Sequence, residues 1–328
     1  MDDTDRLLFR TSLTLSFAKL LRLIQENYPA IGRILSYQPF KEGYDNANFK
    51  LKCSNGGYVA KIFSKKSTFR NIQDNVLIHN TLRLAGVPVP EVINGEMGQV
   101  FLAEDRGNTK VFLIVTDFFE GDTLEKPGIT LDDIKTVTSY LRKINSIKLE
   151  VAENYDSWGA RNFAAEFGKK QQYLSPEHKG PVKQALKEFE KLDFSRYPKS
   201  LIHGDIQRKH VLKNHRGDYV LLDFGCANFD PRVLDPAIFL ATFCFDEKSW
   251  TIRSDIIETL RYNYFEPLRF TERELQALPA LVKATYASYM LNASYLQNKQ
   301  GDESEQTANW LNFSSKMLEL LLDWQKLF

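Results

Sequence analysis

Hydrophobic residues change their spacing within the first third of the chain. Between Leu13 and Tyr28 they recur at helical spacing, which predicts a helix. From Ile34 to Phe63 they alternate or cluster in short β-prone runs, and an Asn-Gly-Gly sequence at 55–57 separates the last two runs. The pattern therefore predicts one helix followed by antiparallel strands.

The later segments divide the chain into two parts. A helix is predicted over 67–85, because Gly86 and the run Val87-Pro88-Val89-Pro90 cannot continue it, and strands are predicted at 99–104 and 110–116. Further helices are predicted over about 130–147, 180–192, 250–264, 271–297 and 304–326, with strand-like runs at 199–230. We therefore predict an α+β, bilobal chain: a β-rich lobe at 1–115 and a mostly helical lobe at 116–328, joined by a hinge near 116–120.

Composition narrows the class of protein. The chain has 328 residues, 43% of them hydrophobic, which is enough for a sizeable core. Because 43 Lys and Arg balance 42 Asp and Glu, no strong field attracts a polyanion, and we expect no nucleic-acid partner. Three scattered cysteines do not suggest a disulfide framework. The acidic start and the absence of a long apolar run predict a cytoplasmic protein with no membrane segment, while the oligomeric state stays open.

Four short features occur in an order that has chemical meaning. The sequence EGYDNANF at 42–49 lies on the turn between two predicted strands, and Lys61 lies inside the next strand. His-Gly-Asp follows at 203–205, and Asp-Phe-Gly at 223–225. Phosphoryl transfer needs a cradle over the phosphates, a cation on their oxygens, a carboxylate at the acceptor hydroxyl and a carboxylate for the metal. The four features supply these groups in the order found in kinases.

With these motifs, the chain resembles the aminoglycoside phosphotransferase and choline kinase superfamily, which has the protein-kinase-like fold. The resemblance rests on His-Gly-Asp in place of the His-Arg-Asp of protein kinases, on GVPVP at 86–90 and on the acidic FFEGDTL at 118–124. It covers about residues 20–300. Within the superfamily the chain is most similar to bacterial homoserine kinases, through EGYDNANFKL at 42–51, LDPAIFLATFCFD at 234–246 and the helical segment at 267–291.

The resemblance implies roles for individual residues. Asp205 matches the aspartate that accepts or orients the proton of the acceptor hydroxyl, although a loop aspartate can also simply cap a turn. Asp223 matches the ligand of Mg²⁺, although it could merely end a strand. Lys61 matches the lysine on the nucleotide phosphates, with a solvent-facing lysine as the alternative. His203 and Asp235 match residues that brace the catalytic loop.

The nucleotide is expected to be ATP or GTP, held with Mg²⁺. Side chains and backbone of the loop at 42–49 would contact the phosphates, and an ordinary hairpin would use the same residue types. The hinge would offer backbone groups to the base. The residues assigned to nucleotide binding are Lys61, Gly43, Asp45, Asn46, Asn48, Asp117 and Phe119.

Two departures from the family pattern are visible. His210 stands where the family usually has a metal-binding asparagine, and imidazole suits Mg²⁺ less well than an amide oxygen. We assign His210 to the metal site with Asp223, leaving open altered metal binding, a hydrogen bond that positions Asp205, or weakened catalysis. The helix at 67–85 has Asp74 but no glutamate to pair with Lys61.

The acceptor is expected to be a small molecule with a hydroxyl and an amino group, such as homoserine or an aminoglycoside. Aromatic residues of the rear lobe would suit a cation, although aromatic residues at helical spacing are more often core. Arg208 and Lys209 beside Asp205 could neutralise the transferred phosphoryl group, or simply be solvated. The main alternative is a nucleotide-binding regulatory pseudokinase with weak or no transfer. Protein kinase activity is disfavoured, because NFDPRVLDPA at 228–237 replaces the segment that follows Asp-Phe-Gly in protein kinases.

Overall fold

The computed structural model describes residues 16–40, 46–64, 67–104, 110–125, 128–246 and 250–321. The chain forms two compact units, Met1–Thr123 with Leu212–Leu222, and Leu124–Val211 with Asp223–Phe328. The first unit therefore extends beyond the boundary expected at 115/116 and includes a later hairpin. Two contacts explain this: Asp122 pairs with Lys213, and the Leu221 N–H donates to the Pro88 carbonyl at 2.8 Å.

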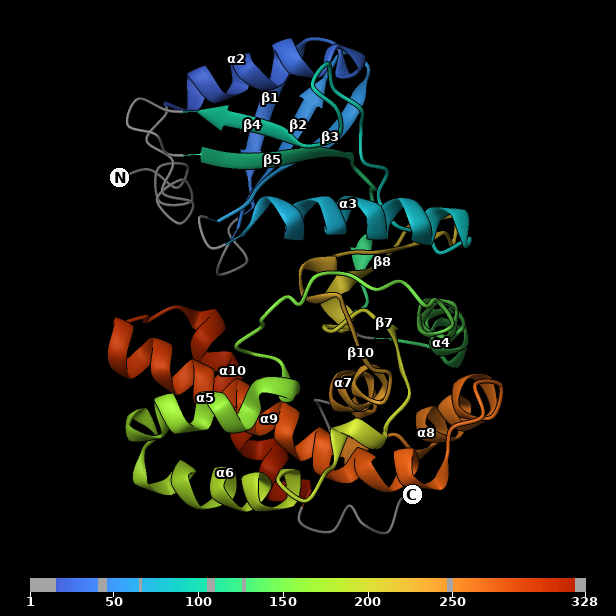
Figure 1. Cartoon of the computed structure of the whole chain (residues 1–328), viewed down its shortest axis with the longest axis vertical. Helices are drawn as coiled ribbons and strands as arrows, with labels where there is room; N and C mark the ends of the chain where they lie inside the picture. The colour runs from blue at the N-terminus through green and yellow to red at the C-terminus, as the bar shows by residue number, and fades with distance from the viewer. Residues whose placement is uncertain are drawn as a thin grey trace. The chain divides into compact units, whose positions relative to one another are not determined.

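A five-stranded antiparallel sheet forms the first unit, as the sequence predicts (Figure 1). Its strand order is β1-β2-β3-β5-β4, with β1 at Ile34–Pro39, β2 at Ala47–Cys53, β3 at Gly56–Ile62, β4 at Phe101–Glu104 and β5 at Lys110–Asp117. The two helices that precede and follow the first three strands are α2 (Phe17–Asn27) and α3 (Phe69–Leu84). The short β6 (Asp122–Thr123) pairs with β8 (Val211–Lys213), which is followed by β9 (Tyr219–Leu221).

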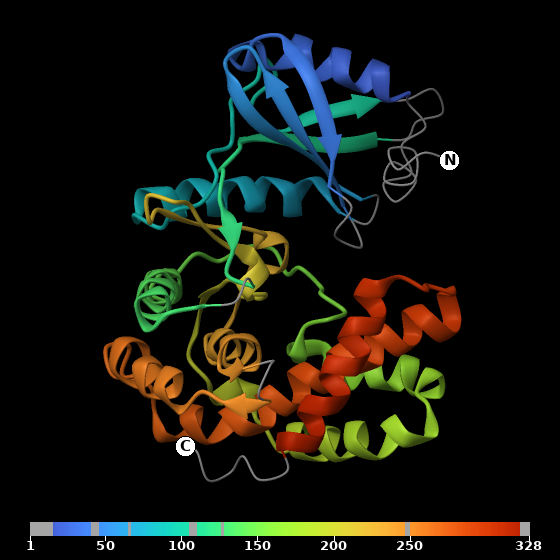
Figure 2. The same cartoon turned by 180° about the vertical axis from the view of Figure 1, so that it is seen from behind.

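The two faces of this sheet are covered by different helices. Leu113 and Val115 belong to the core that includes residues of α2, whereas Ile114 between them packs with residues of α3. Because side chains alternate along a strand, α2 and α3 lie on opposite faces, which Figure 1 and Figure 2 show from two sides. Along β2 and β3 the same alternation puts the buried core side chains on one face of the sheet and the more polar side chains on the other.

The second unit is mostly helical. Its helices are α4 (Leu131–Asn145), α5 (Phe163–Lys170), α6 (Pro176–Phe189), α7 (Leu234–Phe243), α8 (Ser254–Leu260), α9 (Glu272–Gln300) and α10 (Glu305–Leu320). Helix α9 contacts α5, α6, α7 and α10, and Figure 2 shows it among them. Short antiparallel pairs are β7 (Lys199–Ile202) with β10 (Asn228–Pro231), and β11 (Phe245–Asp246) with β12 (Thr251–Ile252).

Single turns of helix connect many of these elements. The 3₁₀ turns are η1 (Pro29–Ile31), η2 (Ala160–Asn162), η3 (Gln171–Tyr173), η4 (Phe194–Arg196), η5 (Arg208–His210) and η6 (Phe224–Cys226), and η7 (Arg261–Phe265) is a π-helical turn. Capping boxes begin α4 at Thr130 and α9 at Thr271, which explains why these two starts were readable in the sequence.

Helices α5 and α7 were not predicted. In α7 nearly every residue is buried, so it lacks the polar face that gives a surface helix its period. Within the described ranges, no helix has the length and apolar character needed to cross a membrane.

Candidate active site

The His-Gly-Asp segment follows β7 and is held by the buried carboxylate of Asp235 on α7. The N–H groups of His203 and Gly204 donate to its two oxygens, each at 2.9 Å, and Asn145 Nδ2 donates at 2.8 Å. Burial raises the pKa of Asp235 to about 6, even though these hydrogen bonds act in the opposite direction. The carboxylate therefore holds the loop at an energetic cost.

His203 has the bracing position that the sequence suggested. It is fully buried, its Nδ1 accepts the Asp205 N–H at 3.2 Å, and its ring centroid lies 4.5 Å from that of Phe224. Because Nδ1 accepts this N–H, it carries no hydrogen there. The side chain joins the His-Gly-Asp loop to the Asp-Phe-Gly turn.

Gly204 lies against the backbone of Cys226, the residue that follows the Asp-Phe-Gly motif. Its φ is +79°, and a Cβ at this position would lie 2.2 Å from the carbonyl oxygen of Cys226. Both the backbone conformation and the contact distance require glycine.

The Asp205 carboxylate is oriented by two polar neighbours from its own loop. Gln207 Nε2 donates to Oδ1 of Asp205 and lies 3.3 Å from the hydroxyl of Tyr289. His210 Nδ1 lies 3.5 Å from Oδ2. Gln207 is buried, and sequence reasoning missed it, although a glutamine two positions after the candidate base was a readable signal.

His210 lies between the two candidate catalytic carboxylates. Its Nδ1 is 2.8 Å from the main-chain oxygen of Asp205, and its Nε2 is 3.8 Å from Oδ2 of Asp223. Since a carbonyl only accepts, Nδ1 carries the hydrogen, and in the neutral ring Nε2 presents its electron pair on the side of Asp223. The histidine and the carboxylate thus face one another with an electron pair on each side.

Asp223 begins the Asp-Phe-Gly turn in a left-handed conformation, with φ at +60°. Its side chain is 48% exposed, which leaves it accessible to a ligand. In the described ranges, no group of three or more His, Cys, Asp or Glu side chains could hold a metal ion. The contact between His210 and Asp223 joins two side chains only.

A third carboxylate lies close to the two motifs. Enclosure of the Cys226 thiol raises its pKa well above the ordinary value, and the negative charges of Asp156, Asp205 and Asp223 raise it further. Asp156 lies in the irregular segment between α4 and α5, where the sequence pattern gave no signal for it.

In the first unit, two of the predicted phosphate-binding side chains share one face of the sheet. Lys61 on β3 pairs across the sheet with Asn48 on β2, and Asn46 comes just before β2. This face is the one that carries Ile114 and α3. Lys61 Nζ lies 5.6 Å from the ring centroid of Phe63, and Asn46 Oδ1 accepts the Ser64 N–H at 3.0 Å.

On α3, the carboxylate of Asp74 is buried and accepts from Arg70 Nε at 3.1 Å. Gly43 and Asp45, which the sequence also assigned to the phosphate cradle, lie outside the described residues.

The hinge presents the backbone groups expected for a base. The Phe118 N–H donates to the Gly57 carbonyl at 3.0 Å. Because hydrogen-bonded and non-hydrogen-bonded pairs alternate in an antiparallel sheet, the N–H and C=O of the preceding residue, Asp117, point away from β3. The Asp117 N–H donates a hydrogen bond to the Glu91 carbonyl at 3.1 Å. Among the described residues, neither the Asp117 C=O nor the Phe119 N–H has a hydrogen-bond partner.

The two basic residues beside Asp205 have structural contacts. Arg208 Nη2 donates to the carbonyl of Phe243 at 2.9 Å and to that of Phe245. Lys209 Nζ lies 5.0 Å from the ring of Trp310 on α10. Arg208 therefore anchors the loop to the end of α7.

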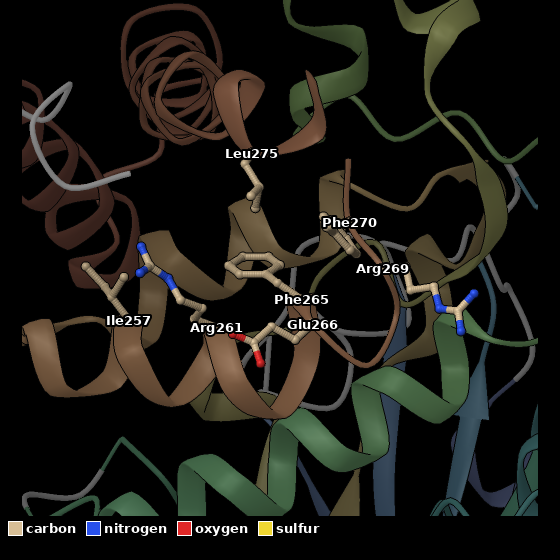
Figure 3. Close-up of a pocket in the computed structure, with 7 residues that line it drawn as sticks. All are labelled: Ile257, Arg261, Phe265, Glu266, Arg269, Phe270 and Leu275. Atoms are coloured by element: carbon tan, nitrogen blue, oxygen red, sulfur yellow. The ribbon is translucent and has the colours of Figure 1, made fainter. Parts of the chain in front are cut away.

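Two pockets of very different size lie in the second unit. The larger, about 250 Å³, is lined by Ile257, Arg261, Phe265, Glu266, Arg269, Phe270 and Leu275, which come from α8, η7 and the start of α9 (Figure 3). None of the residues assigned above lines it. The smaller, about 10 Å³, is lined by Asp205, Gly204 and Asp156 among others. We assign the chemistry to the smaller pocket, because size without reactive groups does not make an active site.

Comparison with known families agrees with this geometry. Residues 36–281 match the phosphotransferase enzyme family. The chain belongs to this family. As a phosphotransferase of this family, it is a small-molecule kinase with an α+β, protein-kinase-like fold, as the motifs predicted.

Individual phosphotransferases show the same relationship. The homoserine kinases of Methylorubrum populi and Zymomonas mobilis are 26% and 23% identical to the chain over 277 and 275 residues, covering 83% and 82% of it and 83% of each relative. A microcompartment-associated aminopropanol kinase superposes with a TM-score of 0.70 at 15% identity, over 95% of this chain and 99% of that one. A spectinomycin phosphotransferase, solved with ADP and spectinomycin, superposes with a TM-score of 0.67 at 13% identity. The match covers 96% of this chain and 100% of that one.

Proposed function

We propose that this phosphotransferase transfers the γ-phosphate of ATP or GTP to a hydroxyl of an amino-bearing small molecule such as homoserine or an aminoglycoside. The observation that carries the proposal is the arrangement in the second unit, where His210 lies within 4 Å of the carboxylates of both Asp205 and Asp223. The residue that we propose as the base and the residue that we propose as a metal ligand thus both lie next to His210.

In this reaction Asp205 accepts the proton of the acceptor hydroxyl as its oxygen forms a bond to the γ-phosphorus. The bond between the γ-phosphorus and the bridging oxygen breaks, and the nucleoside diphosphate leaves with that oxygen. Gln207 holds one oxygen of Asp205, and the Asp235 carboxylate fixes the backbone that carries it. The residues around the base therefore supply orientation.

Lys61 and Asn48 share the face of the sheet that we assign to the phosphates. We assign Asn46, Gly43 and Asp45 to the same ligand on the sequence motif. Lys61 supplies the positive charge that the phosphate oxygens require. The Asp117 carbonyl and the Phe119 N–H are the acceptor and the donor that we assign to the edge of the base.

His210 Nε2 and Asp223 are the groups that we assign to the divalent ion, Mg²⁺ in the family pattern. When bound, such an ion neutralises charge on the β- and γ-phosphates. Because one of its two protein ligands is an imidazole nitrogen, we expect this chain to use Mn²⁺ at least as well as Mg²⁺.

Homoserine is the first acceptor to test, because homoserine kinases match more than four fifths of the chain. A coupled assay with ATP or GTP and either metal should be run with homoserine, short amino alcohols and aminoglycosides. We expect at least one acceptor to give turnover well above that of the Asp205→Asn protein. Turnover no higher than that of Asp205→Asn with every acceptor would overturn the proposal.

The pseudokinase alternative makes a different prediction. Such a protein would be stabilised by nucleotide but would transfer no phosphate. A ligand at 100 times its dissociation constant stabilises the folded state by about 2.7 kcal/mol, so a thermal-shift titration with each nucleotide detects binding without catalysis. Stabilisation without transfer to any acceptor would favour this alternative.

A further inference from the structure

The charged side chains that line the small pocket beside Asp205 are both negative. Asp205 and Asp156 both line it, and its aromatic wall is formed by Trp158 and Tyr289, whose ring centroids are 6.3 Å apart. Burial raises the pKa of the Tyr289 phenol, and the negative charges of both nearby carboxylates raise it further. The pocket therefore has a negative potential that favours a cation.

The carboxylate of Asp156 is held in place by its surroundings. Oδ1 accepts the Trp158 N–H at 2.8 Å, the main-chain oxygen accepts from Asn162 Nδ2 at 2.8 Å, and the carboxylate also accepts a hydrogen bond from the Cys226 thiol. Two residues earlier, Asn154 Nδ2 donates to the Gly225 carbonyl. The segment that carries Asp156 is thus tied to the Asp-Phe-Gly turn.

The size of the pocket selects among cations. A free volume of about 10 Å³ accommodates one water-sized group. A primary ammonium has that size, whereas a trimethylammonium group does not. Carboxylates and aromatic faces are both favourable partners for an ammonium group.

From these observations we propose that Asp156, with Trp158 and Tyr289, forms the subsite for a primary ammonium group of the acceptor and so places the acceptor hydroxyl at Asp205. The inference rests on the proposed function, and it names the acceptor class as primary amino alcohols, including amino acids with a side-chain hydroxyl. A trimethylammonium group is larger than this volume, so we expect quaternary amino alcohols such as choline to bind far more weakly.

The variant Asp156→Asn tests the subsite, because asparagine keeps the oxygen that accepts the Trp158 N–H and loses the charge. Glu153→Gln is the matched control, since it removes one negative charge from an exposed position in the same segment. Calorimetric binding of homoserine, ethanolamine and choline should be measured on the full chain with a non-hydrolysable ATP analogue, because this readout does not depend on turnover.

A charge-assisted hydrogen bond to the ammonium contributes roughly tenfold to hundredfold in affinity. We expect Asp156→Asn to weaken homoserine or ethanolamine binding by at least tenfold and to leave nucleotide binding unchanged. Glu153→Gln should bind these amines like the wild type. The wild type should bind choline far more weakly than ethanolamine. For acceptors that turn over, KM should rise more than kcat falls, and analogues without the amino group should be unaffected by the substitution.

Equal affinity of Asp156→Asn and the wild type for the amine, or choline bound as tightly as ethanolamine, would overturn the inference, as would a wild type that binds none of the three probes. Asp156-dependent binding without phosphoryl transfer would support the subsite while refuting the kinase function, so the two failures are distinguishable.

Discussion

Replacing Asp235 by asparagine should change how the stability of the protein depends on pH. Asp235 is fully buried, and burial raises its pKa from the ordinary 3.8 to about 6. The unfolded chain therefore ionises this group at lower pH than the folded chain. Between these two values the folded state holds a proton that the unfolded state has lost, so the free energy of unfolding falls as the pH rises.

The magnitude follows from the two pKa values. A rise from 3.8 to about 6 corresponds to about 3 kcal/mol of stability that is present below pH 4 and lost once the pH has passed 6. The asparagine that replaces Asp235 has no such titration. Between pH 4 and pH 7 the wild type should thus lose about 2–3 kcal/mol of unfolding free energy relative to Asp235→Asn.

Denaturant unfolding of both proteins across this pH range measures the shift. Only the pH dependence is compared, because the absolute difference also contains the hydrogen bonds that asparagine cannot accept. Despite the relief of buried charge, the variant should lose most of its activity at every pH, since the N–H groups of His203 and Gly204 lose one of their two acceptors. A difference that is constant with pH, or that shifts in favour of the wild type, would refute the reasoning.

Three further substitutions test the proposed site. His210→Asn replaces the proposed nitrogen ligand by an amide oxygen, so the ratio of Mg²⁺ to Mn²⁺ affinity should increase by roughly tenfold. Metal titration of the nucleotide complex measures this ratio, and an unchanged ratio would contradict the proposed role of His210. Lys61→Met should raise the dissociation constant of ATP at least several-fold in a binding titration while the melting temperature stays close to that of the wild type; unaltered ATP affinity would remove Lys61 from the site. Gly204→Ala should destabilise the protein by more than the roughly 1–2 kcal/mol of a left-handed residue, because its Cβ would lie 2.2 Å from the Cys226 oxygen, and a melting temperature like that of the wild type would contradict this contact.

Short linear motifs explain why candidate site residues could be named from the sequence; their roles stay predictions. His-Gly-Asp and Asp-Phe-Gly each place a carboxylate at a fixed point of a loop, so that Asp205 and Asp223 could be named as candidates without knowing the packing around them. The Asn-Gly-Gly signal at 55–57 predicted the turn between β2 and β3, whereas the pairing of Asn48 with Lys61 follows from the register that the structure shows.

The parts that were missed depend on long-range contacts. Helix α7 is buried on all sides and has no amphipathic period, although it carries Asp235. The assignment of 212–222 to the first unit follows from the contact between Leu221 and Pro88, which are far apart in the sequence. Asp156 lies in an irregular segment, and only the folded chain brings it to the pocket beside Asp205.

The most direct test of the central claim is phosphorus NMR of homoserine, ATP and Mg²⁺ incubated with the wild type or with Asp205→Asn. The account predicts a new phosphomonoester resonance with the wild type, growing in step with ADP. Asp205→Asn should bind ATP with unchanged affinity and give no such resonance on the same timescale. A phosphomonoester formed at the wild-type rate by Asp205→Asn would contradict the assignment of the base, and with it the mechanism.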